Sequence, residues 1–179
     1  MLFDETTLHG AYIVRLDPLC DNRGFFARSF CKNEFFDHGL QSDIRQCNIS
    51  FNRAKGTLRG LHYQAPPKSE AKLVYCTQGS IYDVIVDLRP FSPTYCKWEA
   101  VELSADNRRA IYIPENFAHG FQTLEDNSEL LYLMFEFYSP ELSRGVRWDD
   151  PALDITWPLL DPIMSDRDKS YPRYHKEMK

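Results

Sequence analysis

The 179-residue sequence has no long apolar run and no excess of positive charge. No apolar stretch approaches the roughly 20 residues that a membrane-spanning helix needs, and the first residues, MLFDETTLHGAY, lack the basic start and apolar region of a signal peptide. The net charge is −5 and the pI is about 5.5. Nucleic acid is disfavoured as a partner, because a phosphate backbone attracts an excess of Lys and Arg. We expect a cytoplasmic protein with neither a membrane nor a nucleic-acid partner.

Cysteine is also sparse and shows no motif. The five cysteines are an odd number, are widely spaced and include no C-x-x-C pair. The sequence therefore predicts neither a disulfide framework nor a zinc site, and we expect reduced, mostly buried thiols.

Helix signals are nearly absent, whereas strand signals recur along the whole chain. The runs rich in β-branched and aromatic residues are 10–16, 24–30, 44–51, 57–64, 72–77, 80–88, 97–103, 110–114, 119–124 and 130–138. A short helix is predicted over residues 33–38, ended by Gly39. The Pro-rich tail from Ser139 predicts a segment that wraps over the strands. We expect one all-β domain over residues 1–179, built as a sandwich, jelly roll or barrel.

Several polar residues stand where a sealed core would need apolar ones. In the run 80–88, alternation places Asp83 and Asp87 on the face that carries Ile81 and Ile85. In the run 130–138, the face that carries Tyr132 is also partly polar. A carboxylate in an apolar interior is unfavourable unless it is paired or hydrated. We therefore predict a barrel whose interior holds a ligand cavity.

The most polar strand candidate is 57–64, which carries Arg59 and His62. Strict alternation places these two side chains on opposite faces, but Gly60 lies between them, where a β-bulge could turn one of them. Each candidate has an ordinary explanation when taken alone: a surface Arg59, a structural His62, a solvated Lys72 and a core His119. Their joint placement in a longer pattern is what favours a functional site.

The chain closely resembles the dTDP-4-dehydrorhamnose 3,5-epimerase family in the runs GTLRGLHYQAPPKSEAKLV, SIYDVIVDLRPFSPT, IPENFAHGF, RGVRWDDP and ITWP. The resemblance extends from about Asp21 to Pro172. It implies a cupin-like jelly-roll barrel, a homodimer and an isomerase that uses no metal or organic cofactor. Metal-dependent cupins commonly show G-x-H-x-H, whereas this chain has His62 followed by Gln64, and two imidazoles without a clustered carboxylate are a poor transition-metal site.

By resemblance, the reaction inverts C3, C5 or both in a nucleotide-diphosphate-linked 4-keto-6-deoxyhexose. His62 is the expected base, since imidazole suits proton transfer near neutral pH. Asp168 would orient that imidazole, with Asp83 as a second possibility. Tyr132 would be the acid on the opposite face, and Lys72 would stabilise the enolate oxygen at C4.

The resemblance also implies a set of substrate-binding residues. They are Arg23, Phe26, Arg28, Gln46, Asn48, Arg59, Asp83, His119, Tyr138 and Arg167. The first arginine, with Gln46 and Asn48, would hold the diphosphate, and Tyr138 would stack on the base.

One departure from the family concerns the nucleotide carrier. Arg28 stands where relatives usually have a glutamate that accepts a hydrogen bond from the thymine N3–H. Arginine carries only donors, so we predict CDP in preference to dTDP, unless Arg28 points into solvent. Leu133 and Met134 replace residues that are commonly polar, and Arg167 replaces a lysine. A C3-only epimerase, a 3,4-ketoisomerase, a metal-dependent cupin enzyme and a binding module without turnover stay open as alternatives.

Overall fold

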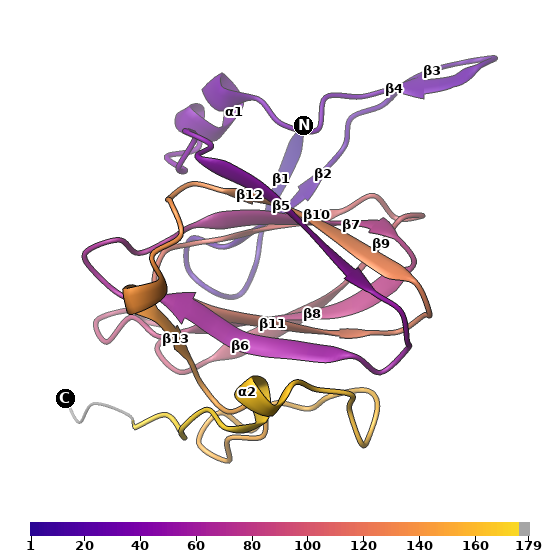
Figure 1. Cartoon of the computed structure of the whole chain (residues 1–179). Coiled ribbons are helices and arrows are strands. Elements are labelled where there is room, and N and C mark those ends of the chain that lie inside the picture. The colour runs from indigo at the N-terminus through magenta and orange to yellow at the C-terminus, as the bar shows by residue number, and fades with distance from the viewer. Residues whose placement is uncertain (176–179) are drawn as a thin grey trace.

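The computed structural model describes residues 1–175, and the predicted domain's last residues, 176–179, lie outside this part. The fold is built on antiparallel strands (Figure 1). The strands are β1 (Leu2–Glu5), β2 (Tyr12–Arg15), β3 (Leu19–Asp21), β4 (Gly24–Phe26), β5 (Gln46–Asn52), β6 (Leu58–Gln64), β7 (Lys72–Gln78), β8 (Ser80–Asp87), β9 (Trp98–Ser104), β10 (Ala110–Ile113), β11 (Phe117–Thr123), β12 (Ser128–Met134) and β13 (Ser143–Gly145). The helical segments are α1 (Lys32–Asp37), the 3-10 turn η1 (Pro140–Leu142) and α2 (Asp166–Lys169).

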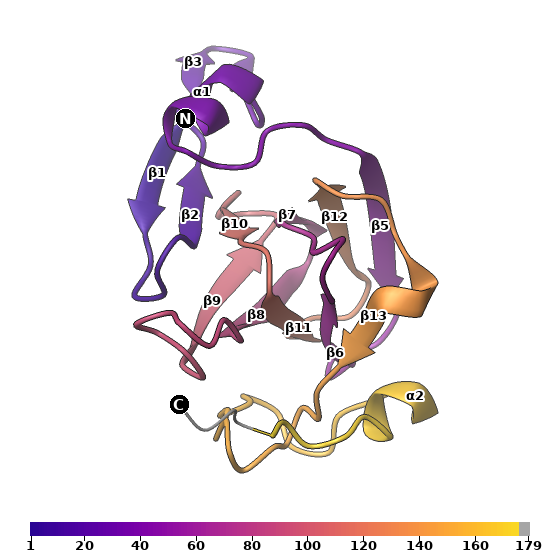
Figure 2. The ribbon, with the colours of Figure 1, turned by 90° about the vertical axis from the view of Figure 1, so that its left-hand side faces the viewer.

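Two sheets face each other and form a jelly-roll barrel, which Figure 2 shows end-on. One sheet has the order β1-β2-β10-β7-β12-β5, and the other has the order β13-β6-β11-β8-β9. The all-β jelly-roll prediction is confirmed. The sheet order places β5 and β6 on one side of the barrel and β9 and β10 on the other.

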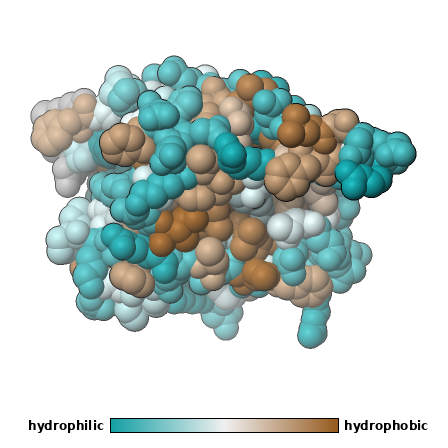
Figure 3. Space-filling model, turned by 90° about the horizontal axis from the view of Figure 1, so that it is seen from above, coloured by the Kyte–Doolittle hydropathy of each residue, from teal (hydrophilic) through white to brown (hydrophobic). Residues whose placement is uncertain are grey.

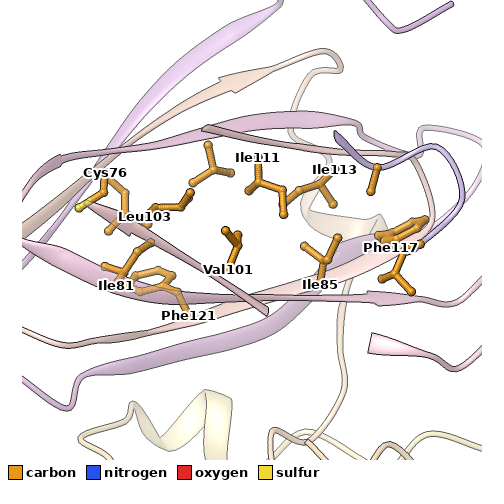
Figure 4. Packing of buried hydrophobic residues seen from close by; sticks show 13 residues of the cluster. Cys76, Ile81, Ile85, Val101, Leu103, Ile111, Ile113, Phe117 and Phe121 are labelled. Carbon is orange, nitrogen blue, oxygen red and sulfur yellow. The ribbon is translucent and has the colours of Figure 1, made fainter. Parts of the chain in front are cut away.

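The β9 and β10 side is filled by apolar residues that point inward from both sheets (Figure 4). The labelled members of this core are Cys76, Ile81, Ile85, Val101, Leu103, Ile111, Ile113, Phe117 and Phe121. Most come from alternate positions of a strand, as the period of two requires. Full burial of one such side chain contributes about 1.5–3 kcal/mol, so this half of the barrel supports the geometry of the other half.

The outer face of each sheet is covered by a different part of the chain. Phe35 of α1 packs on the six-stranded sheet, and α1 begins one residue earlier than predicted and is followed by Gly39 at φ 71°. Val146 and Leu153 of the C-terminal segment pack on the five-stranded sheet, which confirms the predicted wrap. The wrap also contains β13, a strand that the sequence analysis missed.

Two strands end several residues earlier in the structure than the sequence predicts. The run 24–30 is strand only as far as Phe26, and with β3 it forms a two-stranded arm that projects from the barrel (Figure 1). The run 130–138 ends as strand at Met134, because Met134 is paired with the first residues of both neighbours, Lys72 of β7 and Gln46 of β5. Beyond that point neither neighbouring strand continues, so alternation alone could not locate the end.

Candidate active site

A cavity of about 500 Å³ opens between the sheets on the β5 and β6 side. Most of the predicted site residues line it: Gln46, Asn48, Arg59, His62, Lys72, His119, Tyr132, Tyr138 and Arg167. A wider depression of about 730 Å³, which Tyr112 and Glu115 help to line beside the segment that follows α1, contains none of them. The cavity on the β5 and β6 side is therefore the candidate active site.

A β-bulge in β6 brings Arg59 and His62 to the same cavity. His62 lies opposite His119 and Arg59 lies opposite Phe121, so two residues of β6 face one residue of β11. Gly60 permits this arrangement, since its φ is +127° and a Cβ there would lie 2.6 Å from the Gly120 Cα. The predicted bulge is confirmed, and it replaces the strict alternation that would have separated the two side chains.

His62 forms a hydrogen-bonded pair with Asp168 of α2. The His62 Nε2 and the Asp168 Oδ1 are 2.8 Å apart, and Asp168 Oδ2 accepts a second bond from the Gly60 amide at 3.3 Å. Burial alone would raise the pKa of Asp168, but the His62 and Gly60 contacts and the charge of Arg167 outweigh it and hold that pKa below its ordinary value. The carboxylate therefore stays ionised and can stabilise a protonated imidazole.

The position of this pair leaves one imidazole nitrogen for a ligand. Since Nε2 is engaged by Asp168, Nδ1 is the atom of His62 that can take a proton from a substrate. The His62 side chain is 41% exposed, whereas the side chain of Asp168 is 8% exposed. Ser165 caps the start of α2, since its Oγ accepts a hydrogen bond from the Asp168 backbone amide, and this holds the backbone that carries the carboxylate.

A second imidazole–carboxylate pair stands beside the first. The His119 Nε2 lies 2.8 Å from the Asp83 Oδ2, and both residues are buried. The other oxygen of Asp83, Oδ1, is buried and has no hydrogen-bond partner among residues 1–175. Asp83 is thus placed to orient His119, whereas the carboxylate that contacts His62 is Asp168.

Tyr132 faces these imidazoles from the opposite sheet. Its ring lies edge-on to the His119 ring, with 6.2 Å between the centroids. Burial raises the pKa of the Tyr132 phenol far above its ordinary value, and the charge of Asp83 adds to this effect. The phenol is therefore neutral and can donate a proton.

The sequence analysis missed several residues of the cavity. Glu70 accepts a hydrogen bond of 2.8 Å from Lys72 Nζ, and the Tyr171 ring lies edge-on to His62 at 5.6 Å between centroids. Gln64 donates to the Phe137 carbonyl and accepts from the Ser139 amide, so it fixes the chain just beyond β12. The only sequence signal for Glu70 was its position two residues before Lys72, which places both side chains on one face of a strand. Nothing in the sequence pointed to Tyr171.

Four predicted substrate-binding residues do not line the cavity of their own chain, namely the buried Asp83 and the exposed Arg23, Phe26 and Arg28. Arg23 pairs with Asp21 at the tip of the arm, and Phe26 is 74% exposed. Arg28 donates to Glu34 Oε1 at 2.8 Å, and its side chain is 62% exposed.

The interpretation of Asp87 as part of a ligand cavity is wrong. Asp87 lies at the end of β8 and accepts hydrogen bonds from the backbone and guanidinium of Arg89 and from the hydroxyls of Ser92 and Thr94. These partners come from the loop that follows β8, so the carboxylate organises a turn instead of facing a ligand.

The described chain has neither a metal-binding cluster nor a membrane-spanning helix. Within residues 1–175, no three His, Cys, Asp or Glu side chains are grouped so that they could hold a metal ion. None of the described helices is long and apolar enough to span a bilayer.

Comparison with known proteins assigns the family. The family model described as dTDP-4-dehydrorhamnose 3,5-epimerase matches residues 5–176. The dTDP-4-dehydrorhamnose 3,5-epimerase of Shigella flexneri is 46% identical over 149 residues, which are 83% of this chain and 82% of that protein. The crystal structure of the Bacillus anthracis enzyme, with TDP and PPi bound, is 42% identical with a TM-score of 0.93 and covers 97% of this chain and 99% of its own.

A related enzyme of narrower specificity also shares this architecture. The 3′-monoepimerase of Streptomyces bikiniensis, in complex with dTDP-quinovose, is 32% identical with a TM-score of 0.86, and the match covers 94% of this chain and 85% of that one. The family match over nearly the whole chain and the level of identity agree with the barrel and with the contents of its cavity. This chain is therefore an isomerase that belongs to the dTDP-4-dehydrorhamnose 3,5-epimerase family.

Proposed function

We propose that the chain is a cofactor-independent epimerase that inverts carbon centres next to the C4 ketone of a nucleotide-linked 4-keto-6-deoxyhexose. The observation that supports this most directly is the content of one cavity. An imidazole paired with an ionised carboxylate, a neutral phenol and a lysine ammonium meet there. These are the base, acid and cation that removal and return of a proton beside a ketone require.

The reaction begins at His62. Its Nδ1 takes the proton from the carbon next to the ketone, and the electron pair of that C–H bond moves into an enolate whose charge rests on the C4 oxygen. Asp168 stabilises the resulting imidazolium, and Lys72 stabilises the enolate oxygen. The roles of these residues are part of the proposal.

Tyr132 completes the inversion from the other sheet. Its hydroxyl proton passes to the opposite face of the carbon, which converts the enolate back to a ketone and leaves a phenolate. The imidazolium and the phenolate then exchange protons with water, which restores both groups. Because the incoming proton derives from solvent, each inverted carbon acquires a solvent hydrogen.

The nucleotide diphosphate is assigned to the mouth of the cavity. Arg59 and Arg167 both line the cavity, and their guanidinium groups suit phosphate oxygens. Gln46 accepts a hydrogen bond of 2.6 Å from the Tyr138 amide, which holds the 56% exposed Tyr138 beside the mouth. Tyr138 is then available to stack on a base.

The placement of the arm supports a homodimer. Arg23 and Phe26 are predicted to bind substrate but are not among the residues that line the cavity of their own chain. Beside the cavity, β5 exposes Ile49 (67%) and Phe51 (46%), and apolar residues gather near the middle of the face that Figure 3 shows from above. We therefore assign the arm of each copy to the cavity mouth of the other.

Mixing two inactive variants tests this exchange of arms. A chain with Arg23→Ala and Phe26→Ala lacks a working arm, and His62→Asn lacks a base. If the arms act in trans, a mixture of the two proteins regains activity, because one site of each mixed dimer has an intact cavity and an intact arm. A mixture that stays inactive, or a monomer in light scattering, contradicts the assignment.

Arg28 bears on the carrier. We propose dTDP, since Arg28 already donates to Glu34 and the Bacillus anthracis relative was crystallised with TDP. The CDP carrier predicted from the donors of Arg28 is the competing proposal. Calorimetric binding of TDP and CDP to the wild type and to Arg28→Glu separates them. Tighter binding of CDP by the wild type, reversed in the variant, would establish CDP.

Turnover in D₂O tests the reaction itself. We expect deuterium at C3 of a 4-keto-6-deoxy nucleotide sugar, and at C5 as well if the enzyme inverts both centres. Deuterium confined to C3 identifies a monoepimerase like the Streptomyces bikiniensis neighbour. No exchange with either the dTDP or the CDP substrate would refute the proposal.

A further inference from the structure

Lys72 forms a buried ion pair with Glu70 in the cavity wall. The Lys72 Nζ lies 2.8 Å from the Glu70 Oε1, and the two side chains are 6% and 11% exposed. The backbone determines this contact. Ala71 between them is buried, and its carbonyl accepts a hydrogen bond from the Phe135 amide, so residues 70 and 72 point to the same side of the chain.

The loop that carries Glu70 is fixed at two points before it reaches β7. The Gln64 amide donates a hydrogen bond of 2.6 Å to the Lys68 carbonyl. The Ser69 hydroxyl donates one of 2.8 Å to the Asn116 side chain. The backbone of this loop therefore holds Glu70 in a defined position, whereas an exposed carboxylate that contacts a lysine is usually mobile.

The other charged and titratable groups of the cavity do not replace Glu70. Asp168 and Asp83 each bind an imidazole, those of His62 and His119. On β12, Met134 lies opposite Lys72 in the sheet and contributes an uncharged thioether. Two cations, Arg59 and Arg167, and the phenols Tyr132 and Tyr138 also line the cavity. Among residues 1–175, Glu70 is the carboxylate that contacts the ammonium of Lys72.

We propose that Glu70 is a positioning residue that directs the ammonium of Lys72 toward the C4 oxygen of the substrate. This inference rests on the proposed epimerase function. An ammonium has three N–H donors. One is used by Glu70, so two remain for the substrate. Without this contact, the flexible four-carbon side chain of Lys72 would no longer be held in one orientation.

Two variants separate the charge of Glu70 from its contact. Glu70→Gln keeps an oxygen that can accept from Lys72 Nζ but removes the negative charge. Because the contact is kept, we expect its kcat to stay within about threefold of the wild type. Glu70→Ala also loses the contact, and its kcat should fall by about tenfold with KM changed less than twofold.

Two controls accompany these variants. Glu115→Gln removes a carboxylate that hydrogen-bonds Gln41 outside the cavity and should leave kcat and KM unchanged. In a Lys72→Met background, adding Glu70→Ala should cause no further fall in kcat. A Glu70→Gln variant that loses as much kcat as Glu70→Ala, or a Glu70→Ala loss that appears wholly in KM, would overturn the proposal.

A measurement without substrate keeps this test separate from the proposed reaction. In ¹⁵N-lysine-labelled protein, the Lys72 side-chain signal, assigned by its loss in Lys72→Arg, should change its chemical shift in Glu70→Ala and stay close to the wild-type position in Glu70→Gln. If this difference is seen but no deuterium enters the sugar, the epimerase proposal fails while the contact stands. An unchanged Lys72 signal in Glu70→Ala overturns the inference whatever the enzyme catalyses.

Discussion

Two carboxylates on β8 differ in what surrounds them. Asp83 and Asp87 lie four residues apart, point into the same interior and are fully buried. Asp87 accepts hydrogen bonds from Arg89, Ser92 and Thr94. Within residues 1–175, the side chain of Asp83 has one hydrogen-bond partner, His119, and its second oxygen is left without one.

The difference indicates that Asp87 stabilises the fold, whereas Asp83 orients a residue of the cavity. A buried polar group normally has all its hydrogen-bond partners within the protein. A buried group that lacks one of them indicates a functional role besides stability. All side-chain partners of Asp87 come from the loop next to it, whereas Asp83 meets a histidine from another strand. Local partners indicate a structural role here, and a distant titratable partner indicates a functional one.

The largest effect should come from the cavity side, at His62. In His62→Asn, we expect kcat to fall by about 10³-fold, because the proposed base is lost. The free energy of unfolding should change by less than about 1 kcal/mol, since the His62 side chain is 41% exposed and an Asn amide can still donate to Asp168. Single-turnover kinetics and urea unfolding provide the two numbers. If the variant is largely unfolded and this accounts for its lost activity, the distinction between a carboxylate of the fold and one of the cavity would not hold.

The next largest effect should be seen in stability, at Asp87. Asp87→Ala leaves a mostly buried Arg89 without its carboxylate, and we expect a loss of about 3 kcal/mol in the free energy of unfolding. The matched control is Asp4→Ala, which removes the exposed ion pair with Arg15 and should leave stability almost unchanged, because exposed ion pairs contribute little. Similar values for both variants would show that Asp87 does not stabilise the turn.

Asp83 should show the opposite balance. In Asp83→Asn, the remaining amide oxygen can still accept from His119, so unfolding should change by less than about 1 kcal/mol. We expect kcat to fall by about tenfold, because a hydrogen bond to a charged carboxylate is replaced by a weaker one to a neutral amide. Urea unfolding and initial rates on the same preparation test both values. A variant that unfolds much more easily but keeps its normal kcat would show that Asp83, like Asp87, has a structural role.

The smallest effect should appear in the pH dependence of stability. The pKa of Asp87 is held below its ordinary value, because the bonds from Arg89, Ser92 and Thr94 outweigh burial. The folded state thus gains stability above the unfolded pKa of about 3.9 and loses it as the pH falls through the lower folded pKa. Asp87→Asn should lose less stability than the wild type between pH 5 and pH 3. Parallel acid unfolding curves for the two proteins would contradict this.

The sequence predicted the faces of the strands better than their ends and neighbours. The period of two placed Asp83 and Asp87 on one face, but it contained no information on which of them would meet hydroxyl groups from a following loop. The motifs placed His62, Tyr132 and Asp168 in one cavity, although their roles stay predictions. Glu70 went unnoticed, because its importance depends on burial against Lys72, which appears only when the loop is folded.

The arm shows a second limit of prediction from a single chain. The motifs grouped Arg23 with the cavity residues, but that grouping says nothing about whether one chain or two supplies them. Strand patterns describe contacts within a sheet, and the arm makes few contacts with its own barrel.

The close packing of Gly60 against Gly120 has a consequence for redesigning the substrate range. Since the backbones of β6 and β11 touch at this point, the spacing between His62, the proposed base, and Arg59 is set by the main chain and not by adjustable side chains. A donor with a longer or shorter link between sugar and nucleotide would not be accommodated by mutating residues around Arg59. Variants for such donors would have to change residues at the mouth, such as Tyr138 and Arg167, and leave this glycine contact intact.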